Sequence, residues 1–466
     1  MNLERDLLLG LVKDGDLLTA RQEALVRWAI TVARMVLMRT PEGTDVEVAG
    51  VLAPFRGWLI ERLRTAIGTD GAIDGPELRS LCPSIDYRLH AARRLMLDHH
   101  INDFGADELA AEVQHKNLVL VLGGGGGCGF AHLATFELAE RLGIKPKLIV
   151  GSSMGGLLGL FRSMDLTYDP ELIAAALPET FDLRAVFSPF SGQTRFGFPG
   201  AFHMQLLRVG ADAMYRLKGM RQIPRFNELP IRLETVVTGV RTGFVASSTL
   251  QRDIEEASRA GFSPFALRHR MRLFFNAARE LSDNPRLLKQ IVFGREEGTE
   301  SFNVIEATGF SCSVPGLFNY DVFHNDPDTV GTLDAIFERH RIWRMTDGGV
   351  VNNVPSRVAW ESVMAGNLGS RNALIFAGDA FAPSATSLPF FAIQQIARPP
   401  VLANRPFSDY HKTFKSPPSP INLSPSTSKL KRIVLRGLKE LAPERGYLQR
   451  AMKPLPPYRS WSNDPG

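Results

Sequence analysis

The chain has 466 residues, of which 44% are apolar and 22% charged, a balance typical of a folded globular protein and unlike a disordered one. At about 150 residues per domain, this length predicts two or three domains. The net charge of +5 is mild: it is compatible with contact to anionic lipid or phosphate, and we expect no nucleic-acid partner.

Cysteine usage and hydropathy indicate the compartment. Cys82, Cys128 and Cys312 lie far apart without C-x-x-C spacing, which favours a reducing compartment and argues against a disulfide framework or a zinc site. The opening residues M-N-L-E-R-D-L-L-L-G place acids inside an apolar stretch and lack the basic region of a secretory signal. No run of 18 residues is apolar enough to span a bilayer. We therefore expect a cytoplasmic protein whose contact with membranes is at most peripheral.

Residues 1–113 are predicted to form an all-helical accessory domain. Apolar residues recur there at helical spacing, as in Leu59, Leu63 and Ile67. Two turns offer a capping residue three positions before a Gln or Glu, Thr19 before Gln22 and Asp74 before Glu77. Each pair predicts the first turn of a helix.

Residues 116–400 show a different pattern, in which strands alternate with helices. The predicted strands are Leu118–Leu122, Lys147–Val150, Arg232–Thr238 and Ala373–Ala377. Such alternation predicts an α/β domain with a mainly parallel sheet covered by helices. A Gly-, Phe- and Arg-rich stretch between Phe187 and Phe226 lacks clean periodicity, and reads either as an insertion over the site or as a surface excursion.

Residues 401–466 are predicted to hold a Pro- and Ser-rich linker, Lys415–Ser428, and a short basic helix. The helix combines an apolar stripe with five cations: Lys429, Lys431, Arg432, Arg436 and Lys439. A stripe of this kind either docks on the rest of the protein or lies in a membrane interface, and the sequence leaves both interpretations open.

The first predicted strand ends in bare backbone, Gly123–Gly127 followed by Cys128 and Gly129. This satisfies G-x-G-x-x-G, but the ribose-binding acid that a dinucleotide site needs at the end of the second strand is missing. A P-loop is excluded because no Gly-Lys-Ser/Thr closes the loop. We therefore expect no nucleotide cofactor here, and a nucleotide-binding oxidoreductase is the least favoured interpretation.

The second predicted strand ends in G-x-S-x-G, from Gly151 to Gly155, and a helical pattern follows. Such a turn holds its central serine, Ser153, in a strained conformation that only small neighbours tolerate. A serine that attacks an ester creates an oxyanion, which must meet preorganised N–H donors. Glycines let the backbone approach that oxygen closely, so the glycine loop is predicted to be an oxyanion hole.

A serine nucleophile needs a base. In the α/β-hydrolases the triad residues follow one another in the order Ser, acid, His. With Asp347 as the acid, only His411 comes later in the sequence, which leaves a triad esterase as one alternative. The other candidate base is Asp347, in D-G-G with Gly348 and Gly349. Beside a serine turn and a glycine loop, Asp347 completes a Ser–Asp dyad.

Together, these three motifs resemble the patatin-like phospholipase family over about residues 116–400. The resemblance implies a patatin-like three-layer fold, Ser153 as nucleophile, Asp347 as proton acceptor, and a substrate that is a phospholipid or another acyl ester. It assigns the oxyanion hole to Gly124, Gly125, Gly126, Gly127 and Gly129, with Gly151, Gly155, Gly348 and Gly349 in support. It implies no cofactor and no metal. The segment Ala307–Phe318 also resembles one that shapes the family's acyl site.

Cys128 departs from the family's pattern, which carries Arg or Lys at this position. We predict that Cys128→Arg is tolerated and can raise activity, because it restores the residue type that the family usually carries. If Cys128 instead packs as a small buried side chain, the same change is destabilising. The departure also leaves a second class of function open, a catalytically weakened lipid-binding protein, against which the intact Ser153 and Asp347 argue.

Overall fold

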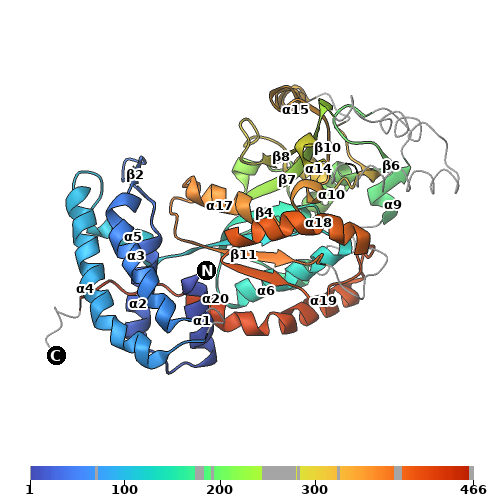
Figure 1. The fold of residues 1–466 in the computed structure, drawn as a ribbon. Helices are drawn as coiled ribbons and strands as arrows, with labels where there is room; N and C mark the ends of the chain where they lie inside the picture. Colours follow the sequence, from blue (N-terminus) through green and yellow to red (C-terminus); the bar gives the residue numbers. More distant parts are fainter. Residues whose placement is uncertain are drawn as a thin grey trace. The chain divides into compact units, whose positions relative to one another are not determined.

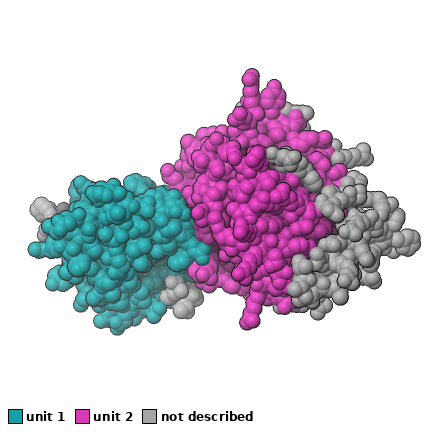
Figure 2. Space-filling view, turned by 90° about the horizontal axis from the view of Figure 1, so that it is seen from above, with its two compact units in different colours: residues 1–118, 360–374, 442–466 teal, residues 119–359, 375–441 magenta. Residues whose placement is uncertain are grey.

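The computed structural model describes residues 2–68, 72–173, 183–189, 194–243, 280, 284–322, 326–382 and 391–460. The chain forms two compact units (Figure 2). The first comprises residues 1–118, 360–374 and 442–466, and the second residues 119–359 and 375–441. Both units are assembled from stretches that are distant in the sequence, whereas the sequence analysis predicted contiguous domains.

The first unit is mainly helical. Its helices are α1 (Leu3–Lys13), α2 (Ala20–Arg34), α3 (Ala49–Ala66), α4 (Gly75–His99), α5 (Ala106–Gln114) and α20 (Ala442–Met452). Thr19 and Asp74 cap α2 and α4 as predicted, each accepting the backbone N–H three residues on. The prediction that this region is all-helical was wrong, because strands β1 (Leu37–Arg39) and β2 (Asp45–Glu47) form a hairpin. Gly43, at a φ of 86°, supplies the left-handed residue in its turn.

The second unit is built on a mostly parallel sheet. Its strands are β3 (Asn117–Leu122), β4 (Pro146–Ser152), β7 (Arg232–Arg241), β8 (Leu288–Phe293), β10 (Ile342–Thr346), β11 (Ala373–Asp379) and β12 (Tyr410–Thr413). The order is β10-β7-β4-β3-β11-β12, with β8 also paired to β7. The four predicted strands are confirmed, while β8, β10 and β12 were not foreseen. Strand β12 pairs with β11, so the sheet extends into the part of the chain predicted to be a linker and a helix.

Helices cover both faces of this sheet, which gives the expected three layers (Figure 1). Helix α6 (His132–Arg141) follows β3, α7 (Met154–Ser163) follows β4, and α19 (Thr427–Glu440) packs against α6. Helix α18 (Phe391–Asn404) connects β11 to β12 and lies on the opposite face. Further helices between β8 and β11 are α14 (Val304–Ser311), α15 (Pro327–His340), α16 (Gly349–Asn352) and α17 (Ser356–Met364).

The Gly- and Phe-rich stretch contributes to a second, smaller sheet. Strand β6 (Gly200–Met204) pairs antiparallel with β5 (Phe187–Pro189) and parallel with β9 (Gly316–Asn319), and the flanking helices are α9 (Leu183–Val186) and α10 (Leu206–Lys218). Phe196 and Phe198 are both buried, so this part of the stretch is core rather than a surface excursion.

Strand β7 aligns the ends of two other strands. Its first half pairs in parallel with β4, up to Ser152 opposite Val236. Its second half pairs antiparallel with β10, down to Thr346 opposite Thr238. Strands β4 and β10 therefore run toward each other along β7 and stop two residues apart, about 7 Å. The residues that follow them, Ser153 and Asp347, meet at this junction.

Candidate active site

Ser153 occupies the turn between β4 and α7 in a strained conformation. Its φ of 52° and ψ of −129° lie in a region that non-glycine residues rarely adopt. The flanking glycines are required by space: a Cβ on Gly151 would lie 2.5 Å from Cα of Gly156, and one on Gly155 would collide with the carbonyl of Leu122. Ser153 is 7% exposed and stands at the N-terminal end of α7.

Asp347 follows β10 and is buried beside Ser153. Its Oδ1 accepts the N–H of Gly349 at 2.7 Å, while Oδ2 is buried without a well-formed hydrogen bond among the described residues. Burial raises the pKa of this carboxyl to about 6, and interactions with the Ser153 hydroxyl and the Gly349 N–H oppose the rise. The carboxylate therefore faces the serine directly, without an intervening imidazole.

Two serines, one at the end of α14 and one just after it, hold the backbone of both residues. The Oγ of Ser311 accepts the N–H of Ser153 at 2.8 Å and donates to the Val236 carbonyl at 2.6 Å. The Ser313 carbonyl accepts the N–H of Asp347 at 2.9 Å. Ser311 and Ser313 lie in the segment Ala307–Phe318, which the resemblance linked to the acyl site. Their contacts with the Ser153 and Asp347 backbones were not predicted, because sequence carries no signal for such a pairing.

The glycine loop lies against Ser153. A Cβ on Gly124 would come within 2.7 Å of Cβ of Ser153. The N–H of Gly124 donates to Oδ1 of Asn353. Gly125 and Gly126 have φ values of 121° and 56°, which favour glycine. In the described part of the chain, the N–H groups of these two residues meet no hydrogen-bond acceptor. Two amides near the serine are thus available to a ligand.

The predicted Pro/Ser linker covers the outer side of this loop. The N–H of Gly127 donates to the Pro420 carbonyl at 2.8 Å, and the Cys128 thiol donates to the Pro418 carbonyl at 3.0 Å. Side chains on Gly126 or Gly127 would collide with this segment. The linker, which the sequence analysis took for a spacer, is therefore packed against the site.

His132 and His411 have different surroundings. His132 is fully buried, and its Nε2 lies 2.8 Å from the Gly123 carbonyl, a bond in which the imidazole N–H donates. Burial lowers the pKa of His132 to about 4, so the ring is neutral and braces the loop. His411 lies on β12, with Nε2 3.9 Å from Oδ2 of Asp379. The structure thus gives His411 a carboxylate other than Asp347.

Residues 120–360, just over half of the chain, match the family model for patatin-like phospholipases. The chain belongs to the patatin-like phospholipase family. A stretch of 89 residues is 35% identical to lysophospholipase NTE1 of Mycosarcoma maydis. That stretch covers 18% of this chain and 5% of the fungal protein, so the chain matches only a small part of that relative's length.

The structure decides between the two expectations for Cys128 in this patatin-like phospholipase. Cys128 is 2% exposed, and burial raises the pKa of its thiol to about 12, so it is a small neutral donor. We expect Cys128→Arg to displace Pro418 and to cost about 1–3 kcal/mol of unfolding free energy from overpacking alone. Thermal melting of the purified variant, with ester turnover, checks this.

Cys128→Ser is the matched control, because it keeps a small donor facing the Pro418 carbonyl. It should melt close to the wild-type temperature. If the arginine variant were as stable and as active as Cys128→Ser, the linker segment that covers the glycine loop would have room for a cation.

Proposed function

We propose that the protein hydrolyses acyl esters of phospholipids or lysophospholipids through a Ser153–Asp347 dyad. One observation carries the proposal: the buried Asp347 carboxylate, with one oxygen lacking a formed hydrogen bond, faces Ser153 at the junction of β4 and β10. An acid placed against a serine in this way can accept the hydroxyl proton. Family membership supports the lipid ester as substrate.

In the first step, Asp347 takes the proton of Ser153 Oγ while Oγ attacks the ester carbonyl carbon. The carbonyl oxygen becomes an oxyanion, which the free N–H groups of Gly125 and Gly126 stabilise. The N-terminal end of α7 adds a favourable dipole. Collapse of the tetrahedral intermediate breaks the ester C–O bond, and the departing alcohol takes the proton from Asp347.

In the second step, Asp347 accepts a proton from water, and the hydroxide attacks the acyl-enzyme carbonyl. The same amides hold the second oxyanion. Its collapse releases the fatty acid, and the proton on Asp347 returns to Ser153 Oγ. The dyad thus ends in the state in which it began, and the reaction needs no group that the chain does not supply.

The dyad predicts that Ser153→Ala and Asp347→Asn each lower ester turnover by roughly 10³-fold or more. The double variant should be no worse than either single one, because the two residues act as a unit. Turnover of a chromogenic ester and of a lysophospholipid measures this, with melting temperature as the check on folding. Near-normal turnover in a folded single variant would contradict the dyad.

His411→Ala separates the dyad from a triad esterase, since a dyad enzyme should keep most of its turnover. Labelling by a fluorophosphonate probe separates either enzyme from a catalytically weakened lipid-binding protein. The probe should label the wild-type chain and spare Ser153→Ala.

The pH profile tests the base independently. Only the ionised Asp347 can accept a proton, and its pKa of about 6 lies above the usual carboxyl range because the group is buried. The neighbouring Cys312 thiol stays neutral, since burial and Asp347 raise its pKa well above the usual value. We expect kcat/KM to be level above pH ~7 and to fall about tenfold per pH unit below pH ~6.

If His411 were the base, the acid limb would move down, because burial and the Arg405 charge lower the pKa of His411 to about 4. Circular dichroism at each pH shows whether the protein is still folded. A limb near pH 4 in folded protein would favour the triad.

The basic helix α19 is the part of the chain that we propose to meet membranes. Its apolar stripe docks on the protein: Leu430 is fully buried, and Gly437 packs against Ala134 of α6. Leu435, 58% exposed, lies on the outer face with the exposed Arg432, Arg436 and Lys439. Among the described residues no helix is long and apolar enough to cross a bilayer.

We expect a variant with Arg432, Arg436 and Lys439 changed to Gln to bind anionic vesicles less tightly at low salt. Each cation near an anionic surface contributes about 1 kcal/mol. Co-sedimentation with phosphatidylserine-containing and neutral vesicles measures the difference. A control with Lys145, Lys147 and Arg221 changed to Gln removes the same charge from other exposed positions of the second unit. Equal loss in both variants would mean that net charge, and not α19, governs binding.

A further inference from the structure

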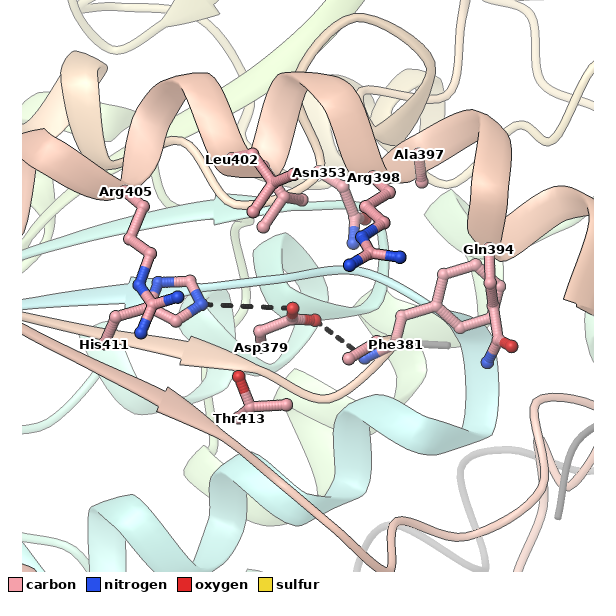
Figure 3. A pocket seen from close by; sticks show the side chains of 12 residues that line it. Asn353, Asp379, Phe381, Gln394, Ala397, Arg398, Leu402, Arg405, His411 and Thr413 are labelled. Atoms are coloured by element: carbon pink, nitrogen blue, oxygen red, sulfur yellow. Dashed lines mark hydrogen bonds and ion pairs between the residues drawn. The ribbon is translucent and has the colours of Figure 1, made fainter. Parts of the chain in front are cut away.

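A pocket of about 230 Å³ lies between α18 and the carboxyl ends of β11 and β12, apart from the Ser153–Asp347 junction. Figure 3 shows Arg398 and Arg405 projecting from the helix side toward Asp379 and His411 on the strand side. None of the residues assigned above to the chemistry lines it. We propose that this pocket binds a phosphate group, and that in the reaction proposed above it receives the phosphate of the lipid substrate.

The charge of the lining favours an anion. Arg398 and Arg405 are seven residues apart, and both are solvent-exposed at the pocket. Planar guanidinium groups match phosphate oxygens in geometry as well as charge. The charge of Arg405 reaches the strand side, because it helps to lower the pKa of His411. The pair therefore acts on the interior of the pocket and not only on bulk solvent.

The lining also contains one acid, Asp379, so two arginines against one carboxyl group leave a net positive charge. It is 5% exposed, and its Oδ1 accepts the N–H of Phe381 at 3.0 Å. Burial raises its pKa to about 6, so most of it is ionised at pH 7, and an anion bound beside it would favour its protonation. Its neighbour His411 has a side chain that is 7% exposed, and its Nδ1 has no partner among the described residues. An unpartnered buried nitrogen in the wall of a pocket is suited to a polar ligand.

The position of the pocket links it to the proposed chemistry. Asn353 lines the pocket, and its Oδ1 accepts the N–H of Gly124. Phe381 lines the pocket as well and packs against Gly125, because a Cβ added to Gly125 would lie 2.7 Å from the Phe381 ring. One layer of side chains therefore separates the pocket from the glycine loop. In a glycerophospholipid, ester and phosphate are carried by the same glycerol, so a substrate can reach both places.

The test compares two substrates that share the acyl chain and differ in the phosphate: oleoyl lysophosphatidic acid and monooleoylglycerol. We expect the double variant Arg398→Gln, Arg405→Gln to lower the ratio of kcat/KM for the first to that for the second by about tenfold or more. Arg221→Gln removes an exposed arginine outside the pocket and should leave the ratio unchanged. An unchanged ratio in the folded double variant, or an equal fall in the control, would overturn the proposal.

A binding arm keeps this result separate from the proposed function. Calorimetry on Ser153→Ala, with and without the two Arg→Gln changes, measures binding of glycerol phosphate and of lysophosphatidic acid. Binding that depends on both arginines supports the pocket even if neither lipid is hydrolysed, a result that would overturn only the proposed activity. Glycerol phosphate binding as tightly as the lipid would overturn the assignment to a lipid headgroup. No arginine-dependent binding of either probe would overturn the phosphate site itself.

Discussion

The site depends on strand β7, which serves as a common template for two strands of opposite direction. Strand β4 pairs with its first half and β10 with its second half, and both end at the centre of β7. Because one partner of β7 is parallel and the other antiparallel, and both lie along the same strand, their ends point toward each other. Ser153 and Asp347 are 194 positions apart in the sequence, and that pairing brings them together without any long loop to position them.

The backbone segments at this junction lie very close together, and glycines make that approach possible because they have no Cβ. A Cβ on Gly348 would collide with the Val236 carbonyl, as one on Gly155 would with that of Leu122. These glycines matter for space rather than for an unusual φ, because neither has a positive value. Ser153 is not a glycine and has a φ of 52°, so it carries backbone strain, and Ser311 holds this conformation by accepting its N–H.

The sequence carried the local parts of this design and missed the parts that depend on pairing. The strand–turn–helix around Ser153 and the caps Thr19 and Asp74 are decided by neighbours in the chain, and the structure has them where they were predicted. Strand β10, which ends one residue before Asp347, has no long apolar run and forms because β7 offers it an edge. The same holds for β12: four residues before a Pro-rich segment are too short to predict, and β11 makes them a strand.

The Pro-rich segment shows how a residue that breaks a family pattern can be accommodated. Cys128 stands where a cation is usual, and its small thiol leaves room for Pro418 to approach and accept its S–H. Pro420 accepts the N–H of the neighbouring Gly127, so the chain near position 420 fixes the loop at two adjacent residues. An N–H already bonded to protein cannot also serve a ligand. The segment therefore holds the loop, and within the described part of the chain it leaves the N–H groups of Gly125 and Gly126 without a protein acceptor.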